Sequence, residues 1–448
     1  ELKASKFGRY ELGDMVGKNG LEKIYESQLR GKKGFKEVEV DVSGRELKAL
    51  RKLSPKTGNS LVLTLDSRVQ GKLETLMDEV LGENSAEGSA VVMNVQSGEI
   101  IAMVSKPSFN PNSFAAGISR KKWNSLVLDE KNPLQNRTID GQYPPASTYK
   151  VVAAYAALSE KIIKPESTIF CPGHFRLGKR DYRCWKKMGH GNMNLHDALV
   201  QSCDVYFYTI GHRLGINNLA KYATKIGLGE LTGIELKGEK SGLVPSKQWK
   251  KKFKNEPWYP GETISASIGQ GYNLVTPLQS ASMISTIASG GLLVRPYLVK
   301  RIEDSDGKLI QEIFPEIRRN IDIDPEVLKH LKEGLRGVVY DARGTGHRAR
   351  LKNVIVSGKT GTAQVVGMKD SEEIDPEEET PYSHRDHAWF VAFAPYEKPE
   401  VAVSVIIEHG GHGGHTAAPI AREILKTYFS HYPPSKTIGL DKERIEVN

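Results

Sequence analysis

The pattern of hydrophobic and polar positions changes near residue 60. Residues 1–59 are polar and rich in turn residues, and only residues 37–41 show the alternation of apolar and polar positions that is typical of a strand. We therefore expect residues 1–59 to form a small accessory module, or the remnant of one.

From residue 60 the pattern of apolar and polar positions becomes more regular. Residues 61–65 predict a strand, and the apolar residues behind it recur at helical spacing: Val69, Leu73, Leu76, Met77 and Val80. Residues 91–95 and 100–104 are largely apolar and flank Gln96-Ser-Gly-Glu99, which predicts a hairpin between two buried strands.

The far end of the chain predicts further strands and a closing helix. The strands are expected at residues 354–357, 388–393 and 401–407. The helix is expected at about 417–428, with these residues on one face: Ile420, Ile424, Leu425 and Tyr428. Between the two sets of strands the patterns are mainly helical. This order predicts an α+β fold, with a mixed sheet assembled from both ends of the domain and packed against a helical region.

Length and composition agree with a folded protein of more than one part. The chain has 448 residues, of which 39% are hydrophobic and 26% are charged. We divide it into the accessory module at 1–59, a main domain at 60–432 and a tail at 433–448. No apolar run reaches the roughly 20 residues that a membrane-spanning helix needs.

The net charge of +9 comes from Lys and Arg residues in short scattered groups. They form no basic stripe with interleaved aromatic residues, so nucleic acid is not expected as a partner. An excess of positive charge suits a protein that works against an anionic surface or polymer, such as a membrane face or a cell wall.

A first chemical motif is Ser147-Thr-Tyr-Lys150, which follows Tyr143-Pro-Pro-Ala146 and precedes the apolar run 151–158. Two prolines ahead of an apolar helix place Ser147 at the helix start, near unpaired backbone N–H groups and the positive end of the helix dipole. Lys150 follows one turn later on the same face. A lysine can activate a serine hydroxyl if burial or a nearby cation lowers its pKa, so the pair predicts acyl transfer.

Two more motifs follow in order. Ser202-Cys-Asp204 lies at the junction of two helical patterns, and Lys359-Thr-Gly-Thr362 comes directly after the predicted strand 354–357. Single matches mean little, because Ser119-Arg-Lys-Lys122 has the spacing of the first motif in a wholly charged segment. The three motifs together, in this order, are typical of penicillin-binding proteins and class A β-lactamases.

The sequence resembles the class B penicillin-binding proteins, and within them the elongation-type transpeptidases. The resemblance runs over almost the whole chain, and the segments that carry it are these: Gly20-Leu-Glu-Lys-Ile-Tyr-Glu26, Leu63-Thr-Leu-Asp66, Tyr143 to Lys150, Gly269-Gln-Gly-Tyr272, Lys359-Thr-Gly-Thr-Ala-Gln364 and Glu408-His-Gly-Gly411. It implies a penicillin-binding/β-lactamase-like transpeptidase domain with a remnant pedestal at its N-terminus.

The resemblance also implies the catalytic roles. Ser147 would attack the penultimate D-Ala carbonyl of a peptidoglycan stem peptide, expel the terminal D-Ala and pass the acyl group to an amine on a neighbouring stem. Lys150 would be the general base, and Ser202 would relay the proton toward the leaving amine with help from Lys359. β-Lactam antibiotics would acylate the same serine.

Substrate binding is expected along the third motif. Thr360, Gly361 and Thr362 would contact the substrate, with the two hydroxyl groups holding its terminal carboxylate. Backbone N–H groups of Ser147 and Thr362 would form the oxyanion hole. Asp204 stands where the common family pattern has Asn; an ionised Asp only accepts hydrogen bonds, so we expect it to accept from a lysine or a substrate amide.

The resemblance implies a setting as well. We expect a single-pass protein of the cytoplasmic (inner) membrane, anchored through an N-terminal segment that precedes Glu1, with its catalytic domain in the periplasm. It would work with a polytopic glycan polymerase and with proteins of the rod-shape elongation complex.

The three cysteines, Cys171, Cys184 and Cys203, are close in sequence to His190. An odd number argues against a complete disulfide framework, and three thiolates with one imidazole complete a tetrahedral zinc site. The spacing lacks the short pairs of ordinary zinc modules, so the pattern alone leaves open zinc, or one disulfide with a free thiol.

Some members of the resembling subfamily hold a zinc beside the second motif. The resemblance therefore favours a structural zinc bound by Cys171, Cys184, His190 and Cys203, and no organic cofactor is expected. Substitute ligands nearby are His174, Asp181 and His196. The segment His409-Gly-Gly-His-Gly-Gly-His415 favours a Gly-rich strand-to-helix connection near the active site over a metal site. Trp185 is expected in the core.

Two other functions remain open from the sequence. One is a hydrolase with the same residues and water as acceptor, either a D,D-carboxypeptidase or a β-lactamase; a β-lactamase needs no accessory module. The other is a non-catalytic penicillin-sensing scaffold, against which the full set of catalytic side chains argues.

Overall fold

The computed structural model describes residues 10–434, with the exception of 12–13, 83–86, 116 and 366–380. The predicted tail at 433–448 therefore lies almost entirely outside the described residues. No helix in the described part of the chain is long and apolar enough to cross a membrane.

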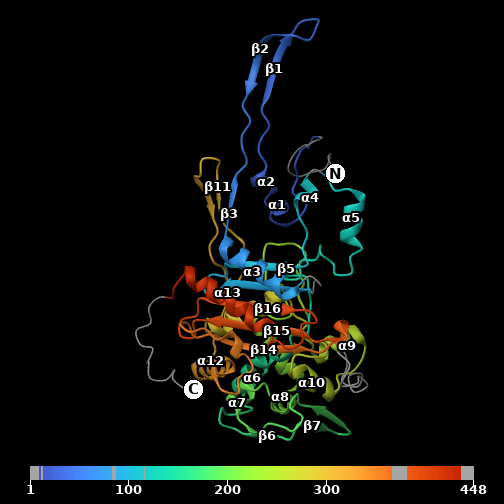
Figure 1. Ribbon diagram of the computed structural model, residues 1–448, viewed down its shortest axis with the longest axis vertical. Helices are drawn as coiled ribbons and strands as arrows, with labels where there is room; N and C mark the ends of the chain where they lie inside the picture. The colour runs from blue at the N-terminus through green and yellow to red at the C-terminus, as the bar shows by residue number, and fades with distance from the viewer. Residues whose placement is uncertain (1–9, 12–13, 83–86, 116, 366–380, 435–448) are drawn as a thin grey trace.

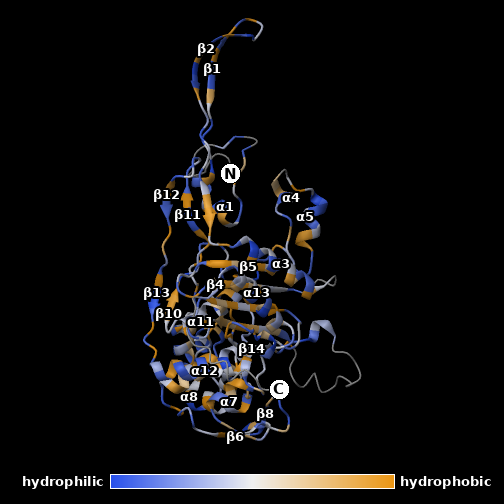
Figure 2. Cartoon of the chain, turned by 60° about the vertical axis from the view of Figure 1, so that its left-hand side comes forward, coloured by the Kyte–Doolittle hydropathy of each residue, from blue (hydrophilic) through white to orange (hydrophobic). Residues whose placement is uncertain are grey.

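The N-terminal part ends in a two-stranded ribbon that projects from the body of the molecule (Figure 1). Its elements are α1 (Gly20–Ile24), α2 (Glu26–Leu29), β1 (Phe35–Val40) and β2 (Glu46–Leu53). In the part of the chain that the structure describes, β1 and β2 form a two-stranded antiparallel sheet. Figure 2 shows hydrophobic and hydrophilic residues mixed along the ribbon, and both strands are largely exposed. The strand predicted at residues 37–41 is confirmed in this ribbon.

A short sheet of order β12-β11-β3 lies below the ribbon. Its strands are β3 (Ser60–Leu63), β11 (Val299–Glu303) and β12 (Leu309–Glu312). Helix α3 (Ser67–Leu81) follows, capped by Asp66, whose carboxylate accepts hydrogen bonds from the N–H groups of Arg68 and Val69. The predicted apolar face is buried except for Val80, which is 43% exposed because Leu81 fills the last buried position of the helix.

The central sheet has five strands in the order β14-β15-β16-β4-β5. They are β14 (Ser357–Ala363), β15 (His387–Ala394), β16 (Val401–Ile407), β4 (Gly88–Asn94) and β5 (Ile100–Lys106). The predicted assembly from both ends of the domain is confirmed, and so is the hairpin between β4 and β5. All four neighbouring pairs are antiparallel, so the sheet is not mixed as expected. Short connections account for this direction in the β4–β5 and β15–β16 pairs.

The third motif lies within strand β14, whereas the sequence pattern placed it directly after a strand at residues 354–357. Residues 354–356 precede β14, with Val354 and Val356 buried beneath the sheet, and β14 itself begins at Ser357. Residues 357–363 form a strand because β15 pairs with them in register, from Ser357↔Phe393 to Ala363↔His387. β14 is also the edge strand of the sheet, so its outer side faces the helical region and not another strand.

The sheet separates two hydrophobic cores, and alternate residues of β15 enter each. Trp389, Val391 and Phe393 face the helical region. Phe390 and Ala392 pack against α3 and α13 (Ala417–His431) on the opposite face. The buried face predicted for the closing helix is confirmed.

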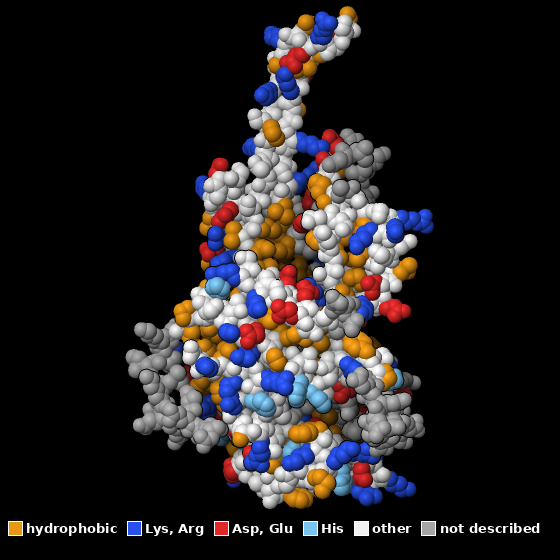
Figure 3. Space-filling view, viewed as in Figure 1, with side chains coloured by type: hydrophobic (Ala, Val, Ile, Leu, Met, Phe, Trp, Pro, Cys, Tyr) orange, Lys and Arg blue, Asp and Glu red, His pale blue; other side chains and the backbone are white. Residues whose placement is uncertain are grey.

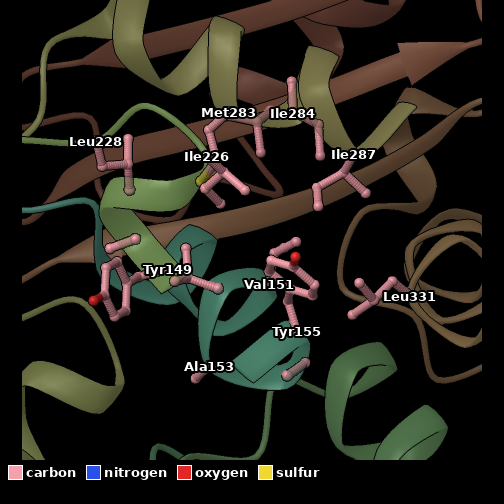
Figure 4. Packing of buried hydrophobic residues seen from close by; sticks show 14 of the residues in the cluster. Tyr149, Val151, Ala153, Tyr155, Ile226, Leu228, Met283, Ile284, Ile287 and Leu331 are labelled. Carbon is pink, nitrogen blue, oxygen red and sulfur yellow. The ribbon is translucent and has the colours of Figure 1, made fainter. Parts of the chain in front are cut away.

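The first core is built around α6 (Lys150–Ser159), α11 (Pro277–Ala288) and α12 (Pro325–Tyr340). Figure 4 shows Val151 and Tyr155 of α6 beneath Met283, Ile284 and Ile287 of α11, with Leu331 of α12 beside them. The first residues of α6 are thereby fixed by packing on several sides, which matters because the first motif lies there.

The region between the strands is helical, as predicted, but it also carries short strands. Its further helices are α4 (Asn112–Ala115), α5 (Arg120–Val127), α7 (Leu195–Val200), α8 (Asp204–Lys225), α9 (Lys247–Lys254) and α10 (Pro260–Ser267). Its antiparallel pairs are β6 (Ile169–Cys171) with β9 (Gly191–Met193), β7 (His174–Leu177) with β8 (Arg180–Arg183), and β10 (Leu292–Val294) with β13 (Ile317–Asn320).

Candidate active site

Ser147 lies in a short 3-10 helix, η1 (Ala146–Tyr149), that leads directly into α6. The residue before it, Ala146, has a left-handed backbone with φ +49°, a strained conformation for a residue with a side chain. The N–H of Ala146 donates to the carbonyl of Gly269 at 3.0 Å, which helps to hold this backbone. Ser147 is half-buried, whereas Thr148, Tyr149 and Lys150 are buried, so the serine is the exposed member of its turn.

Lys150 brings the first and second motifs together. Its buried ammonium group contacts Ser202 Oγ at 3.0 Å, the Ser202 carbonyl at 2.8 Å and Asp204 Oδ1 at 2.7 Å. Ser202 itself has φ +54°, a second left-handed residue at this site. Asp204 therefore accepts a hydrogen bond from a lysine, one of the two roles that the sequence allowed.

The other oxygen of Asp204 is bound by Trp185. Asp204 Oδ2 accepts from the backbone N–H of Trp185 at 2.9 Å, and the Trp185 indole N–H donates to the carbonyls of Gln201 and Ser202, each at 3.1 Å. The prediction that Trp185 belongs to the core is wrong: the residue is 59% exposed. Its side chain lies over the second motif because the indole N–H needs hydrogen-bond acceptors, and the carbonyls of Gln201 and Ser202 provide them.

Lys359 lies on β14 and is fully buried. Burial lowers the pKa of Lys359 well below its usual range, and the positive charge of Lys150 adds to this, while Asp204 acts in the opposite direction. Protonating both buried lysines beside a single carboxylate costs free energy, so this environment favours the neutral amine at Lys359.

The rest of the third motif packs against η1 and the neighbouring loop. Thr360 Oγ1 is 2.8 Å from Thr345 Oγ1, and the half-buried Thr362 accepts a hydrogen bond at its carbonyl from Gln270. A Cβ on Gly361 would lie 2.9 Å from the Cβ of Trp389 and 3.2 Å from Cγ2 of Thr148. Only glycine lets β14 approach the nucleophile this closely.

An ion pair that the sequence analysis missed anchors the loop before Ser147. Glu408 Oε1 accepts from Arg137 Nε at 2.8 Å and from the Tyr143 hydroxyl at 2.7 Å, and Arg137 is only 3% exposed. The Trp389 indole N–H adds a bond to the Pro144 carbonyl at 3.1 Å. Glu408 belongs to one of the segments that carry the family resemblance. No pattern in the sequence indicates that it contacts residues about 270 positions earlier.

Replacing Glu408 with alanine is expected to lower the free energy of unfolding by about 3–5 kcal/mol, because it leaves the buried Arg137 without its partner. The rate of Ser147 acylation should fall as well, since the Tyr143 loop loses its anchor. Chemical denaturation and stopped-flow acylation measure the two effects. As the control, Glu423→Ala removes the surface ion pairs of Glu423 with Arg422 and Lys426 on α13 and should cost no more than about 1 kcal/mol. Equal effects of the two substitutions would contradict the anchoring role.

The four predicted metal ligands converge behind the second motif. One donor atom each from Cys171, Cys184, His190 and Cys203 lies within 4.8 Å of the others. His190 Nδ1 is 3.6 Å from Cys171 Sγ and 3.5 Å from Cys184 Sγ. A tetrahedral zinc with ordinary Zn–S and Zn–N lengths needs a separation of about 3.5 Å between sulfur and nitrogen ligands, so these residues fit zinc.

The thiols of this cluster have unequal proton affinities. A hydrogen bond from Cys203 lowers the pKa of Cys184 to about 3, and the same contact raises the pKa of Cys203. Burial raises the pKa of Cys171. The three cysteines are free thiols. The substitute ligands are elsewhere: Asp181 contacts Arg176, His196 contacts Asp341, and His174 is an exposed residue of β7.

The remaining sequence candidates lie apart from the site or support it. Ser119 caps the exposed helix α5, with its hydroxyl accepting from the Lys122 N–H at 3.3 Å, so its Ser-x-x-Lys spacing is a surface coincidence. Residues 409–415 connect β16 to α13, as predicted. A Cβ on Gly413 would lie 2.5 Å from the Gly361 carbonyl oxygen, so this connection packs directly behind the third motif.

A β-sheet with helices on both faces, a Ser-x-x-Lys turn at a helix start and a Lys-Thr-Gly edge strand define the penicillin-recognising class of proteins. Residues 88–426 match the family model "Penicillin binding protein transpeptidase domain", and residues 1–63 match "Penicillin-binding Protein dimerisation domain". The chain therefore belongs to the penicillin-binding protein transpeptidase family.

Within the family, the chain is similar to the peptidoglycan D,D-transpeptidase MrdA of Haemophilus influenzae, at 37% identity over 96% of this chain and 65% of that protein. The chain thus spans slightly less than two thirds of the length of this relative. Two solved structures of PBP2 are also similar. The Pseudomonas aeruginosa protein in complex with WCK 5153 is 35% identical with a TM-score of 0.77, covering 92% of this chain and 84% of that one. The Helicobacter pylori protein in complex with MreC is 36% identical with a TM-score of 0.79, covering 93% and 73%.

Proposed function

We propose that this chain is a serine-type peptidoglycan D,D-transpeptidase that cross-links stem peptides during cell elongation and is acylated by β-lactams. One observation carries the proposal: a buried Lys150 contacts Ser202 and Asp204 one helical turn from Ser147, with Lys359 on the adjoining edge strand. The similarity to MrdA and to two PBP2 structures supports it.

In the proposed reaction, the Lys150 ammonium first passes one proton to the neutral amine of Lys359. The Ser147 oxygen then attacks the carbonyl carbon of the penultimate D-Ala while its own proton passes to the freed Lys150 amine. The bond to the terminal D-Ala then breaks, and the leaving nitrogen takes a proton relayed through Ser202. An acceptor amine attacks the resulting ester and restores the Ser147 hydroxyl. Lys359, whose pKa burial lowers, is the neutral amine that can share the proton of Lys150 during these transfers.

Binding of the donor would use the outer edge of β14. Thr360 and Thr362 would hold the terminal carboxylate, and backbone N–H groups of Ser147 and Thr362 would stabilise the oxyanion, a contribution of about 3–4 kcal/mol for each donor. The close packing of Gly361 against η1 supports this role, because it keeps the strand and the nucleophile at a fixed separation.

We also propose that a structural zinc is bound by Cys171, Cys184, His190 and Cys203. Zinc would contribute no reaction step; it would fix the backbone of residues 202–204, because Cys203 is the middle residue of the second motif. The fit of the four donor atoms supports this proposal.

For the setting of the enzyme, we propose an anchor in the cytoplasmic membrane outside these 448 residues, a periplasmic catalytic domain and partners in the elongation complex. A similar structure is the PBP2 of Helicobacter pylori with MreC, and another belongs to a peptidoglycan synthase complex of polymerization and crosslinking. On the face shown in Figure 3, Lys and Arg side chains are scattered among other types, which agrees with cell-wall partners better than with a nucleic acid.

The mass of the intact protein after incubation with benzylpenicillin tests the proposal. We expect one adduct on Ser147 that persists for hours. An adduct that disappears within seconds would identify a β-lactamase, and the absence of any adduct would overturn the proposal. A thioester donor with a D-amino acid acceptor then separates the remaining functions: transfer to the amine indicates a transpeptidase, hydrolysis alone a carboxypeptidase, and no turnover a penicillin-sensing scaffold.

A further inference from the structure

The two N–H groups of Trp185 both bind the second motif, although most of this side chain is exposed. Trp185 follows Cys184 in the loop behind strand β8, and it is 59% exposed. Its backbone N–H donates to Asp204 Oδ2 at 2.9 Å, and its indole N–H donates to the carbonyls of Gln201 and Ser202, each at 3.1 Å. Water could satisfy an exposed indole N–H, so burial alone does not explain why this one points inward.

The Ser202 carbonyl that Trp185 binds belongs to a strained residue. Ser202 has φ +54°, a left-handed backbone that costs free energy for a residue with a side chain. A carbonyl oxygen has two lone pairs, and here the Trp185 indole and the Lys150 ammonium occupy both, at 3.1 Å and 2.8 Å. These two donors fix the plane of the peptide bond after Ser202. The fixed backbone also sets the direction of the Ser202 hydroxyl, which lies 3.0 Å from the Lys150 nitrogen.

The backbone N–H of Trp185 fixes the other end of the motif. Asp204 Oδ2 accepts from this N–H at 2.9 Å, and Asp204 Oδ1 accepts from Lys150 at 2.7 Å. Because each carboxylate oxygen has its own donor, rotation of the Asp204 carboxylate would break both bonds. Trp185 and Lys150 thus bind the same two residues, Ser202 and Asp204. The contacts of Trp185 therefore bear directly on the geometry around the general base.

The loop that carries Trp185 is itself closely packed. The N–H of Cys184 donates to the Gly173 carbonyl at 2.7 Å, and a Cβ on Gly173 would lie 2.1 Å from the Lys187 carbonyl oxygen. The Trp185 ring meets the His190 ring edge to face, with centroids 5.2 Å apart and an interplanar angle of 68°. The indole is therefore held against the second motif by packing as well as by its hydrogen bonds.

We propose that Trp185 is a positioning residue for the acylation step: its indole N–H holds the Ser202 carbonyl and so keeps the Ser202 hydroxyl directed at Lys150. The inference rests on the proposed function, because it assigns Trp185 a place in the proton relay of that reaction. Trp185 acts through Ser202 and Asp204 and needs no contact with the donor peptide. The role is separate from that of the proposed zinc, because the indole N–H is not a metal ligand.

Replacement of Trp185 with 3-benzothienylalanine tests the inference, because sulfur takes the place of the indole N–H while the shape of the ring is kept. Stopped-flow acylation with a chromogenic cephalosporin gives two quantities, the dissociation constant of the non-covalent complex and the rate constant of Ser147 acylation. We expect the rate constant to fall by roughly 5- to 10-fold, the effect of losing one hydrogen bond, with the dissociation constant unchanged. Replacement with 7-azatryptophan retains the N–H and should restore the wild-type rate constant.

Trp123 is the matched control, because it is a tryptophan of similar exposure, at 43%, on helix α5. The same replacement at Trp123 should leave the rate constant unchanged, and the metal content of the Trp185 variant should equal that of the wild-type protein.

The inference is overturned if 3-benzothienylalanine at position 185 leaves the rate constant at the wild-type value, if 7-azatryptophan lowers it equally, or if the variant has lost metal. It is also overturned if only the dissociation constant rises, because Trp185 would then contact the cephalosporin and not position Ser202. A wild-type protein that the cephalosporin does not acylate contradicts the proposed function itself.

Discussion

Replacing Lys150 with methionine is expected to lower the rate of Ser147 acylation by roughly 10²- to 10⁴-fold, the usual contribution of a positioned general base. Methionine keeps the length of the side chain and removes the amine that contacts Ser202 Oγ and Asp204.

The same substitution should lower the free energy of unfolding by about 3–5 kcal/mol, because Asp204 is left without its charged partner in a largely buried site. Stopped-flow acylation with a chromogenic cephalosporin and thermal unfolding measure both effects on one sample. Ser147→Ala serves as the reference for complete loss of the adduct, with little change in stability.

Lys122→Met is the matched control, since Lys122 follows Ser119 with the same spacing on the exposed helix α5. It should change neither the acylation rate nor the unfolding temperature. A Lys150→Met protein that is acylated at the wild-type rate would show that another residue is the base.

Loss of a metal ligand is expected to have the second largest effect. Cys171 is buried in β6 and belongs to none of the three motifs, so its replacement by alanine removes a proposed zinc ligand without removing a catalytic side chain. We expect the bound zinc to fall from one per chain to nearly none, and the unfolding temperature to fall by roughly 5–15 °C. Acylation of Ser147 should slow by roughly 10²-fold, because a small displacement of residues 202–204 misplaces Ser202.

Metal analysis, thermal unfolding and acylation rates check this prediction together, and a strong chelator added to the wild-type protein should reproduce the effects. His174→Ala and His196→Ala are the controls, because neither histidine belongs to the cluster. A wild-type protein that contains no zinc but is acylated at full rate, or a mass that reveals a disulfide, would contradict the metal site.

The elements of the fold that depend on local sequence patterns could be predicted. The β4–β5 hairpin and the helix at 417–431 follow from alternation and helical spacing in continuous segments. β14 was misplaced by a few residues because Gly358, Thr360 and Gly361 have no strand-like pattern; the strand exists through its ladder with β15. Strand pairing between distant segments is a tertiary effect that single-sequence patterns do not contain.

The same distinction applies to the site. The three motifs and the four metal ligands could be proposed from residue types, order and family resemblance. The Arg137–Glu408–Tyr143 contacts and the contact of Trp185 with Asp204 could not, because each joins separated segments through one side chain. Trp185 was assigned to the core because aromatic residues at helical spacing are usually buried, although its indole N–H needed a partner.

The order of strands in the central sheet also has a consequence for how the protein is made. β4 can form its ladder with β16 only after β16 has been synthesised, and β16 lies roughly 300 positions later in the chain. Pairing between such distant segments makes folding slow. At 5–20 residues per second, about 15–60 s of synthesis separates the two strands. During that time the β4–β5 hairpin exposes two apolar faces, so the nascent chain depends on a chaperone or on being kept extended until its last strands emerge. The edge strand that carries Lys359 is likewise paired only after residues 387–394 have been synthesised, because β15 is its partner.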